Sequence, residues 1–408
     1  MTHPAPAPAD TAAVRRHNLA LVLRRIAAGP CARTDIAAAT GLVHASVTGL
    51  TAELLERGLV REVGAAATGG RGRPRRLLEL VPGRVLTIAA QVTLERVETM
   101  AADLAGAVVH RSSAVHRAPY GDADALAAAV AREVRLAADA VRDRPGAHLA
   151  RVVVAMAGPV TGPGETVAAA IDFGWRGHTD LRALVAAHLP RLDRPLDVVN
   201  DANVAALAEY HAREDELPYV VAYVKADTGV GGGLLIGGRI HAGAHGAGGE
   251  IGHMPIAFDG PPCPCGARGC LAQYIGPEPL LATAGLAALR DTSGTDAALT
   301  ELDRRLHAED RTACAALHDA GGKLAAAILA VSGVTDAGEV ILGGYLADWY
   351  TWLRPGIDEA LSTRRTLVPD LTLRVTPGAL GRDATLRGAV ESGRLGVLDD
   401  PTGVPVVG

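Results

Sequence analysis

The chain has 408 residues, of which 49% are apolar and 21% charged, and its formal net charge is −5. This length exceeds a single hydrophobic core, so we expect two or three domains with the apolar content of a globular protein. No run of about 18 uncharged apolar residues suggests a membrane span, and the first residues lack the basic and apolar regions of a signal peptide. We therefore expect a cytoplasmic protein that does not contact a membrane.

The charge is unevenly distributed along the chain. Residues 1–80 hold eleven arginines, no lysine and six acidic residues, whereas the remainder holds 29 basic and 39 acidic side chains. A basic N-terminal module on an acidic body predicts that the module, and not the body, binds a polyanion.

The N-terminal module is predicted to contain three helices and two short strands. The helices cover Val14 to Ile26, Thr34 to Thr40 and about His44 to Arg57, and the strands cover Val60 to Val63 and Leu77 to Leu80. This order is typical of a winged helix-turn-helix, with the turn at Gly41 letting the third helix enter a major groove. The apolar side chains of the first helix are expected on one face: Val14, Leu19, Val22, Leu23 and Ile26.

The outward positions of the third helix indicate contact with DNA. His44, Ser46 and Thr48 can reach phosphates or base edges. Arg71 and Arg73, in the Gly- and Arg-rich loop that follows, suit a narrow minor groove, whose negative potential attracts arginine. The alternatives are that the helix residues are simply solvated and that the loop is a flexible linker.

From Val85 onward, apolar strands alternate with Ala-rich helices, which predicts an α/β body of two lobes. The predicted strands are Val152–Ala157, Leu196–Asn200, Tyr219–Lys225 and Glu339–Gly343, and the predicted helices are Asp122–Asp143, Asn203–Arg213 and Thr312–Val331.

Two motifs lie at predicted strand ends. Asp201, in Asn200-Asp201-Ala202-Asn203, suits either a helix cap or a general base that takes a proton from a sugar hydroxyl, and local sequence favours the cap. The turn Asp227-Thr228-Gly229 can either cradle a phosphate with its backbone amides or form a plain hairpin.

A metal-ligand pattern follows these motifs. His253, Cys263, Cys265 and Cys270 form the string H-x9-C-x-C-x4-C and include three of the five cysteines in the chain. One imidazole and three thiolates match the ligand set of a closed, four-coordinate structural zinc site. Clustered cysteines of this kind indicate a metal site in a reducing compartment rather than a disulfide framework.

Together these motifs resemble the ROK family of bacterial sugar-responsive repressors and sugar kinases, over about Val14 to Gly396. The resemblance implies a two-lobed actin-like, hexokinase-type (ribonuclease H-like) α/β body around a cleft, behind the winged helix-turn-helix. It also implies zinc on the four metal-ligand residues and sugar contacts from Asn200, Asp201, Glu250 and His253. The residues that carry it are Val14–Asn18, Gly72-Arg73-Pro74, Gly158-Pro159-Val160, Asn200–Asn203, Gly246–His253, Cys263–Cys270, Leu342-Gly343-Gly344, Gly381-x-Asp383-Ala384 and Gly388-Ala389.

The chain departs from this family at three places. Sugar kinases of the family carry D-x-G-G-T after the first strand of the body, but here Ala90-Gln91-Val92-Thr93 follows, which lacks the acidic residue and both glycines. Ala272 stands where sugar-binding members have Glu, with Gln273 offset by one residue. Val43 replaces the usual serine cap of the third helix, and Gly49 replaces a larger residue, so the DNA site recognised should differ from those of relatives.

These observations predict a sequence-specific transcriptional regulator, a repressor without enzyme activity whose affinity for DNA is set by a carbohydrate-type effector between the lobes. A homodimer or homotetramer would bind an inverted repeat in double-stranded DNA. Two alternatives remain: a sugar kinase fused to a DNA-binding domain, and a repressor that needs no effector because Ala272 has removed the sugar grip. The expected divisions are a tail (1–12), the winged helix-turn-helix (13–67), an Arg/Gly linker and wing strand (68–80), a first lobe (81–202), a second lobe with the zinc motif (203–385), and a C-terminal helix that returns to the first lobe, with a tail (386–408).

Overall fold

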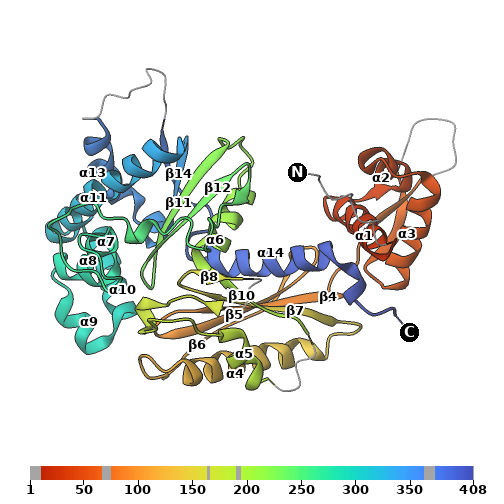
Figure 1. Ribbon diagram of the computed structural model, residues 1–408, viewed down its shortest axis with the longest axis horizontal. Coiled ribbons are helices and arrows are strands. Elements are labelled where there is room, and N and C mark those ends of the chain that lie inside the picture. Colours follow the sequence, from red (N-terminus) through yellow and green to blue (C-terminus); the bar gives the residue numbers. More distant parts are fainter. Residues whose placement is uncertain (1–10, 67–74, 163–165, 190–193, 363–372, 408) are drawn as a thin grey trace, which may run out of the picture.

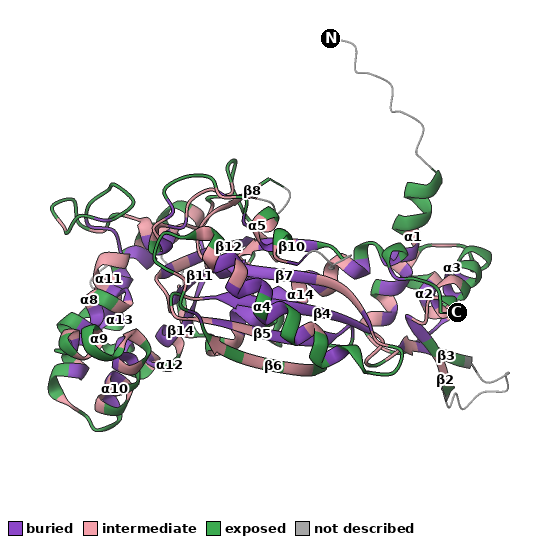
Figure 2. Cartoon of the chain, turned by 90° about the horizontal axis from the view of Figure 1, so that it is seen from below, coloured by how far each residue is buried: buried purple, intermediate pink, exposed green. Residues whose placement is uncertain are grey.

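The computed structural model describes residues 11–66, 75–162, 166–189, 194–362 and 373–407. Figure 1 shows a small N-terminal helical unit beside a larger body that contains two five-stranded sheets. Figure 2 shows that the central strands of the body are buried, whereas exposed residues gather on its outer helices.

The N-terminal unit is a winged helix-turn-helix. Helices α1 (Thr11–Ala27), α2 (Arg33–Thr40) and α3 (His44–Glu56) pack beside an antiparallel sheet of order β1-β3-β2, in which β2 spans Val60–Ala66 and β3 spans Arg75–Leu80. Gly41 follows α2 with a φ of 73°, a left-handed conformation that favours glycine. Strand β1 (Cys31–Ala32) was not predicted, and Val14 was wrongly placed on the buried face, because the first turn of α1 extends beyond the core and leaves Val14 45% exposed.

The first lobe is a sheet of order β10-β7-β4-β5-β6. Strands β4 (Val85–Val92), β5 (Arg96–Asp103) and β6 (Val108–Val115) are antiparallel neighbours, while β7 (His148–Met156) and β10 (Leu196–Asn200) run parallel to β4. Every residue of β4 is buried because helices cover both faces of the sheet. Helices α4 (Ala123–Arg142) and α5 (Leu181–Ala187) lie on one face and α14 (Ala384–Asp399) on the other, with β8 (Val160–Thr161), β9 (Thr166–Val167) and η1 (Ile171–Phe173) at one end.

The second lobe is a sheet of order β13-β12-β11-β14-β15. Its strands are β11 (Val220–Ala226), β12 (Val230–Ile236), β13 (Arg239–Ile240), β14 (Glu339–Gly344) and β15 (Arg374–Pro377). Its helices are α6 (Asp201–His211), η2 (Ile251–His253), α7 (Ala272–Ile275), α8 (Pro277–Thr283), α9 (Ala287–Ser293), α10 (Thr295–His307), α11 (Arg311–Thr335), α12 (Tyr345–Asp348) and α13 (Tyr350–Ser362), and η3 (Gly381–Asp383) and η4 (Pro401–Gly403) flank α14.

Helix α11 is long and apolar enough to span a membrane by length and composition. Its residues Leu317, Leu324 and Ile328 are nevertheless buried in the main apolar cluster of the second lobe. A core helix of this kind passes the same test, so α11 is weak evidence for a span.

Candidate functional site

A pocket of about 220 Å³ lies where elements of the two lobes meet. Its walls come from the end of β7, the start of α6, the turn between β11 and β12, and the segment around η2. The four residues expected to contact a sugar all line it: Asn200, Asp201, Glu250 and His253.

Asn200, and not Asp201, caps helix α6. The Asn200 Oδ1 accepts a hydrogen bond from the amide of Asn203 at 2.8 Å, and its Nδ2 donates to the carbonyl of Gly158 at 2.9 Å. The capping interpretation of Asp201 was therefore wrong by one residue, because two adjacent side chains are both good caps and only the backbone geometry chooses between them. Asp201 is left to face the pocket, although only 5% of it is exposed.

A buried lysine holds Asp201. The Nζ of Lys225, on β11, lies 2.6 Å from Oδ2 of Asp201 and 2.7 Å from Oδ2 of Asp227, and it donates to the hydroxyl of Thr385 at 3.2 Å. Burial by itself would lower the pKa of Lys225, but the carboxylates of Asp201 and Asp227 raise it above its ordinary value, so the ammonium group stays charged. No sequence motif pointed to this contact. The sequence did contain one sign that Lys225 is unusual: it is one of only two lysines in the chain, and it lies in an otherwise apolar strand.

Two further carboxyl groups of the pocket have no hydrogen-bond or ion-pair partner among the described residues. Burial, with the nearby charges of Asp201 and Asp227, raises the pKa of Asp172 to about 6. Burial, with the charges of Asp201 and Asp172, raises the pKa of Glu250 to about 7. The pocket thus contains more negative than positive charge, which disfavours the binding of an anionic ligand. No sequence motif pointed to Asp172.

The turn between β11 and β12 is a plain hairpin. Ala226 pairs with Val230, and the Oδ1 of Asp227 accepts the amide N–H of Thr228, one of the groups that a phosphate would need. A side chain at Gly229 would collide with the carboxylate of Asp172, which shows how closely that charge approaches the turn. The turn therefore presents carboxylates where a phosphate cradle would present free amides.

The turn between β4 and β5, where the kinase loop would lie, contacts the second lobe. Thr93 closes the turn by accepting the amide of Arg96 at 3.0 Å. The Oε1 of Glu95 accepts the amide of Thr295 at 2.8 Å, at the first turn of α10. A carboxylate bound to the N-terminus of α10 thus links this turn to the second lobe, as the favourable interaction between an anion and the helix dipole predicts.

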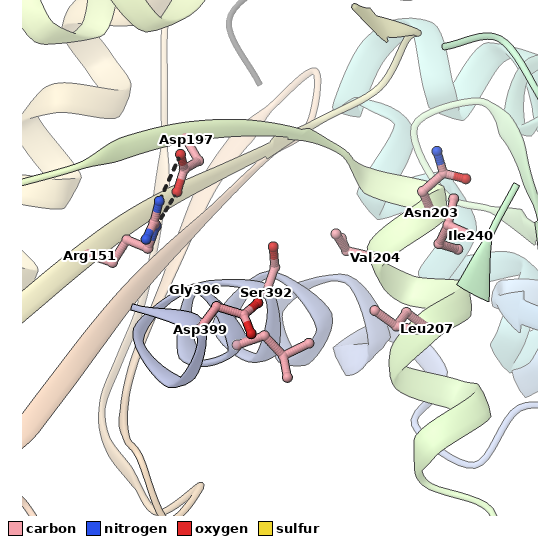
Figure 3. A pocket seen from close by; sticks show the side chains of 10 residues that line it. Arg151, Asp197, Asn203, Val204, Leu207, Ile240, Ser392, Gly396 and Asp399 are labelled. Atoms are coloured by element: carbon pink, nitrogen blue, oxygen red, sulfur yellow. Dashed lines mark hydrogen bonds and ion pairs between the residues drawn. The ribbon is translucent and has the colours of Figure 1, made fainter. Parts of the chain in front are cut away.

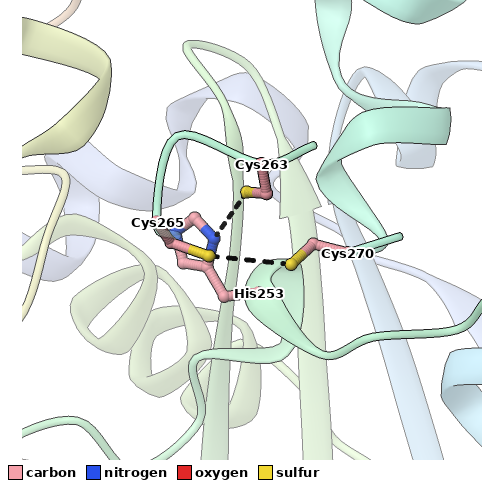
Figure 4. Close-up of side chains that lie close together, drawn as sticks. All are labelled: His253, Cys263, Cys265 and Cys270. Atoms are coloured by element: carbon pink, nitrogen blue, oxygen red, sulfur yellow. Dashed lines mark hydrogen bonds between the residues drawn. The ribbon is translucent and has the colours of Figure 1, made fainter. Parts of the chain in front are cut away.

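The four expected metal ligands converge. Their ligand atoms all lie within 4.8 Å of one another, with 3.6 Å between His253 Nδ1 and Cys263 Sγ and 3.7 Å between Cys265 Sγ and Cys270 Sγ (Figure 4). A tetrahedron with zinc–sulfur bonds of about 2.3 Å has edges of about 3.8 Å, so the donors present fit a zinc ion. His253 also lines the pocket, so the cluster and the pocket share this residue.

Gln273 contacts the metal cluster without being one of its four residues. Its Nε2 donates to the Sγ of Cys263 at 3.6 Å, while Ala272, at the start of α7, packs against the apolar core of the second lobe. Neither residue lines the pocket. The carboxylate that family members place after the last cysteine therefore has no replacement at these two positions.

On the winged helix, the three expected residues of α3, His44, Ser46 and Thr48, are all exposed. The hydroxyl of Thr48 donates to the carbonyl of His44 at 2.9 Å and keeps its lone pairs free to accept a hydrogen bond. Val43 precedes the helix without a side-chain cap, as expected. Arg71 and Arg73 lie outside the described residues.

Comparison with known proteins agrees with this architecture. The sequence profile described as the ROK family matches residues 91–391. The chain is 32% identical to the kanosamine kinase of Amycolatopsis mediterranei, over 61% of this chain and 78% of that protein, and 23% identical to the xylose repressor of Bacillus spizizenii, over 93% and 95%. A crystal structure described as a ROK family transcriptional regulator, a homologue of the Escherichia coli Mlc protein, superposes with a TM-score of 0.77 at 21% identity, covering 96% of this chain and 99% of the other. The predicted fold class is thereby confirmed.

Proposed function

The chain belongs to the ROK family, and from this premise we propose that it is a DNA-binding transcriptional repressor whose affinity for its operator is set by a carbohydrate bound between the lobes. The observation that carries the proposal is the combination of an exposed α3 on a winged helix with an interlobe pocket that holds Asn200 and Asp201 but opposes phosphate. Similarity to a repressor along 93% of the chain supports the regulatory half of this proposal.

DNA would be bound by α3. In a winged helix, the third helix enters the major groove and its exposed side chains meet base edges and phosphates. His44, Ser46 and Thr48 present a donor ring and two hydroxyls there. A homodimer or homotetramer would place two such helices on an inverted repeat, with Arg71 and Arg73 adding contacts in the minor groove.

The effector would be an uncharged or amine-bearing carbohydrate rather than a sugar phosphate. Amide and carboxylate side chains such as Asn200 and Glu250 pair well with adjacent hydroxyls. The unpaired carboxyl groups of Asp172 and Glu250 would repel a phosphate. Asp227 already accepts a hydrogen bond from the amide of Thr228, which a phosphate would need. The missing carboxylate at Ala272 means that hydroxyl recognition relies on fewer groups than in sugar-binding relatives.

Phosphoryl transfer is not part of the proposed function. Kinase relatives make it the competing candidate, with Asp201 as the base. In this chain, however, Asp201 is already paired with Lys225, and the strand β4 runs through Ala90 and Gln91 without the glycines that admit phosphates. The candidate base and the phosphate-binding loop thus both differ from what phosphoryl transfer would need.

Zinc, held by His253, Cys263, Cys265 and Cys270, would act as a structural clamp. It would fix the loop that follows η2 and so hold His253 at the wall of the pocket. With one imidazole and three thiolates filling all four positions, it would leave no open position for chemistry on the metal.

The direct test is to map the binding sites of the protein across the genome of its source and to repeat gel shifts on the strongest site with a panel of compounds. The proposal expects discrete sites, and release of the DNA by a neutral sugar or amino sugar but not by a sugar phosphate. Discrete sites with no release by any compound would instead favour the effector-independent repressor. The absence of discrete sites would overturn the regulatory function.

A further inference from the structure

Helix α14 joins the pocket to the DNA-binding unit. Its first turn carries Thr385, which accepts a hydrogen bond from Lys225 behind the pocket. At its other end, Val397 and Leu398 belong to the same apolar cluster as Leu19 and Leu23 of α1. Figure 1 shows α14 lying across the first-lobe sheet with its C-terminal end beside the N-terminal helices.

Polar contacts reinforce the far end of this path. The Nε of Arg24, on α1, donates to Oδ1 of Asp399 at 2.9 Å. The residues that follow α14 contact the end of α3. Arg57 donates to the carbonyl of Val404 at 2.6 Å, and the amide of Val407 donates to the carbonyl of Glu56 at 2.9 Å. The segment from α14 to Val407 therefore holds both α1 and the C-terminal end of α3, the proposed recognition helix.

The near end of α14 is in direct backbone contact with α6. A side chain at Gly388 would collide with the carbonyl oxygen of Val204, and one at Gly393 would collide with Thr87 on β4. Close-packed helices of this kind move together, because their interface does not deform continuously. Any shift of α6, which begins at the pocket residue Asp201, is therefore passed to α14.

Farther along, α6 and α14 are separated by a second pocket of about 410 Å³. Figure 3 shows Arg151 and Asp197 on one side of it, Val204 and Leu207 of α6 on another, and Ser392 and Asp399 of α14 between them. The C-terminal half of α14 is thus not fixed against α6 along this side, which leaves α6 room to shift.

Lys225 lines the pocket and contacts the first residues of both α6 and α14. Only 2% of the residue is exposed, and its ammonium group contacts Asp201 at the start of α6, Asp227 in the hairpin turn and Thr385 at the start of α14. A buried ammonium group must keep its partners, because leaving it unpaired costs several kcal/mol. A ligand that draws Asp201 or Asp227 toward its own hydroxyls therefore forces Lys225, and with it Thr385, to follow.

We propose that Lys225 is the positioning residue that couples the pocket to the DNA-binding unit, by moving the first turn of α14 when Asp201 or Asp227 binds a ligand. This inference rests on the proposed function, since it takes the pocket as the effector site. Lys225 lies on β11 of the body and outside the apolar cluster shared by α1 and α14, so its influence on the N-terminal unit must pass along α14.

A double-mutant cycle tests the coupling without a known effector. Asp227→Asn perturbs the pocket end by reducing the charge that Lys225 faces, and Thr385→Val removes only the hydroxyl that Lys225 contacts. The probe is a DNA duplex enriched by the wild-type protein from a random pool. We expect Asp227→Asn to change the Kd for this duplex by about fivefold or more, and by less than about twofold when Thr385→Val is also present.

The matched control is Thr99→Val. Thr99 is a fully buried threonine of β5 whose hydroxyl pairs with Ser112, away from Lys225. Asp227→Asn should keep its full effect in the Thr99→Val protein. An unchanged Kd for Asp227→Asn, or an equal effect with and without Thr385→Val, overturns the coupling while the proposed function stands.

Amide hydrogen exchange distinguishes a failure of the coupling from a failure of the proposed function. If the wild-type protein enriches no DNA, the proposed function fails, and exchange in α1 then tests the coupling alone. Asp227→Asn should alter the exchange of α1 amides in the Thr385 protein and leave them unaltered in the Thr385→Val protein. An unaltered α1 in both proteins overturns the inference.

Discussion

The Nζ of Lys225, on β11, lies 2.6 Å from the Oδ2 of Asp201, at the start of α6, so an ammonium group neutralises the carboxylate that was the candidate base. The same ammonium group lies 2.7 Å from Asp227, in the turn that would otherwise face a phosphate. Lys225 thus pairs with both the candidate base, Asp201, and the residue of the turn, Asp227. It also connects this pair to α14 through its hydrogen bond with Thr385.

We predict no phosphoryl transfer from ATP to hexoses or hexosamines. Asp201 is held by Lys225, and no glycine pair after β4 admits the phosphates. A coupled assay for ADP release should give the rate of a no-enzyme control, and Asp201→Asn should give that same rate. Turnover above the control that Asp201→Asn abolishes would show that the protein is a kinase.

Replacing Lys225 should destabilise the fold. Lys225→Met leaves the buried Asp201 and the partly buried Asp227 without their counter-ion, a change that costs about 3–5 kcal/mol in the free energy of unfolding. The matched control is Lys323→Met, at the second lysine of the chain, whose Nζ lies 5.5 Å from the centre of the Tyr274 ring and which should cost about 1 kcal/mol or less. Equal losses in urea denaturation would contradict the role given to Lys225.

Much of this site could be predicted from residues close together in the sequence. The four metal ligands fall within eighteen positions, and the helices of the N-terminal unit show clear apolar spacing. The contacts of Lys225 could not be predicted, because Thr385 lies 160 positions from it and the three side chains meet only through the tertiary fold. Asp172 was missed for the same reason, since its raised pKa comes from burial and from distant carboxylates that no local pattern records.

Asp172 should make stability depend on pH. Its pKa is raised from 3.8 to about 6 in the folded protein, so folding favours the protonated carboxyl. Its stabilising contribution is complete below the unfolded-state pKa and is lost as the pH rises through the folded-state value, by at most about 3 kcal/mol.

Asp172→Asn removes this titration. The variant should therefore gain free energy of unfolding relative to wild type between about pH 4 and about pH 7, and little below that range. Asp319→Asn, at an exposed position of α11, is the control and should follow the wild-type profile. Parallel wild-type and Asp172→Asn profiles, measured by urea denaturation at each pH, would contradict this prediction.

Zinc removal should loosen the pocket wall. Cys265→Ser takes one thiolate from the cluster, so metal content should fall well below about one zinc per chain and Tm should drop. Cys314→Ser, at a free cysteine outside the cluster, is the control and should keep its zinc. Full metal content in Cys265→Ser, by elemental analysis of the dialysed protein, would rule out the four-residue site.

The exposed face of α3 carries the central claim, and fluorescence anisotropy of a labelled duplex from the strongest genomic site tests it most directly. Ser46→Glu places a negative charge on that face, and repulsion of the DNA phosphates should weaken binding by about tenfold or more. Ser293→Glu makes the same change at an exposed position at the end of α9 and should bind like wild type. Tight binding by wild type and Ser293→Glu with loss in Ser46→Glu is the predicted result, and equal affinity for all three proteins would contradict it.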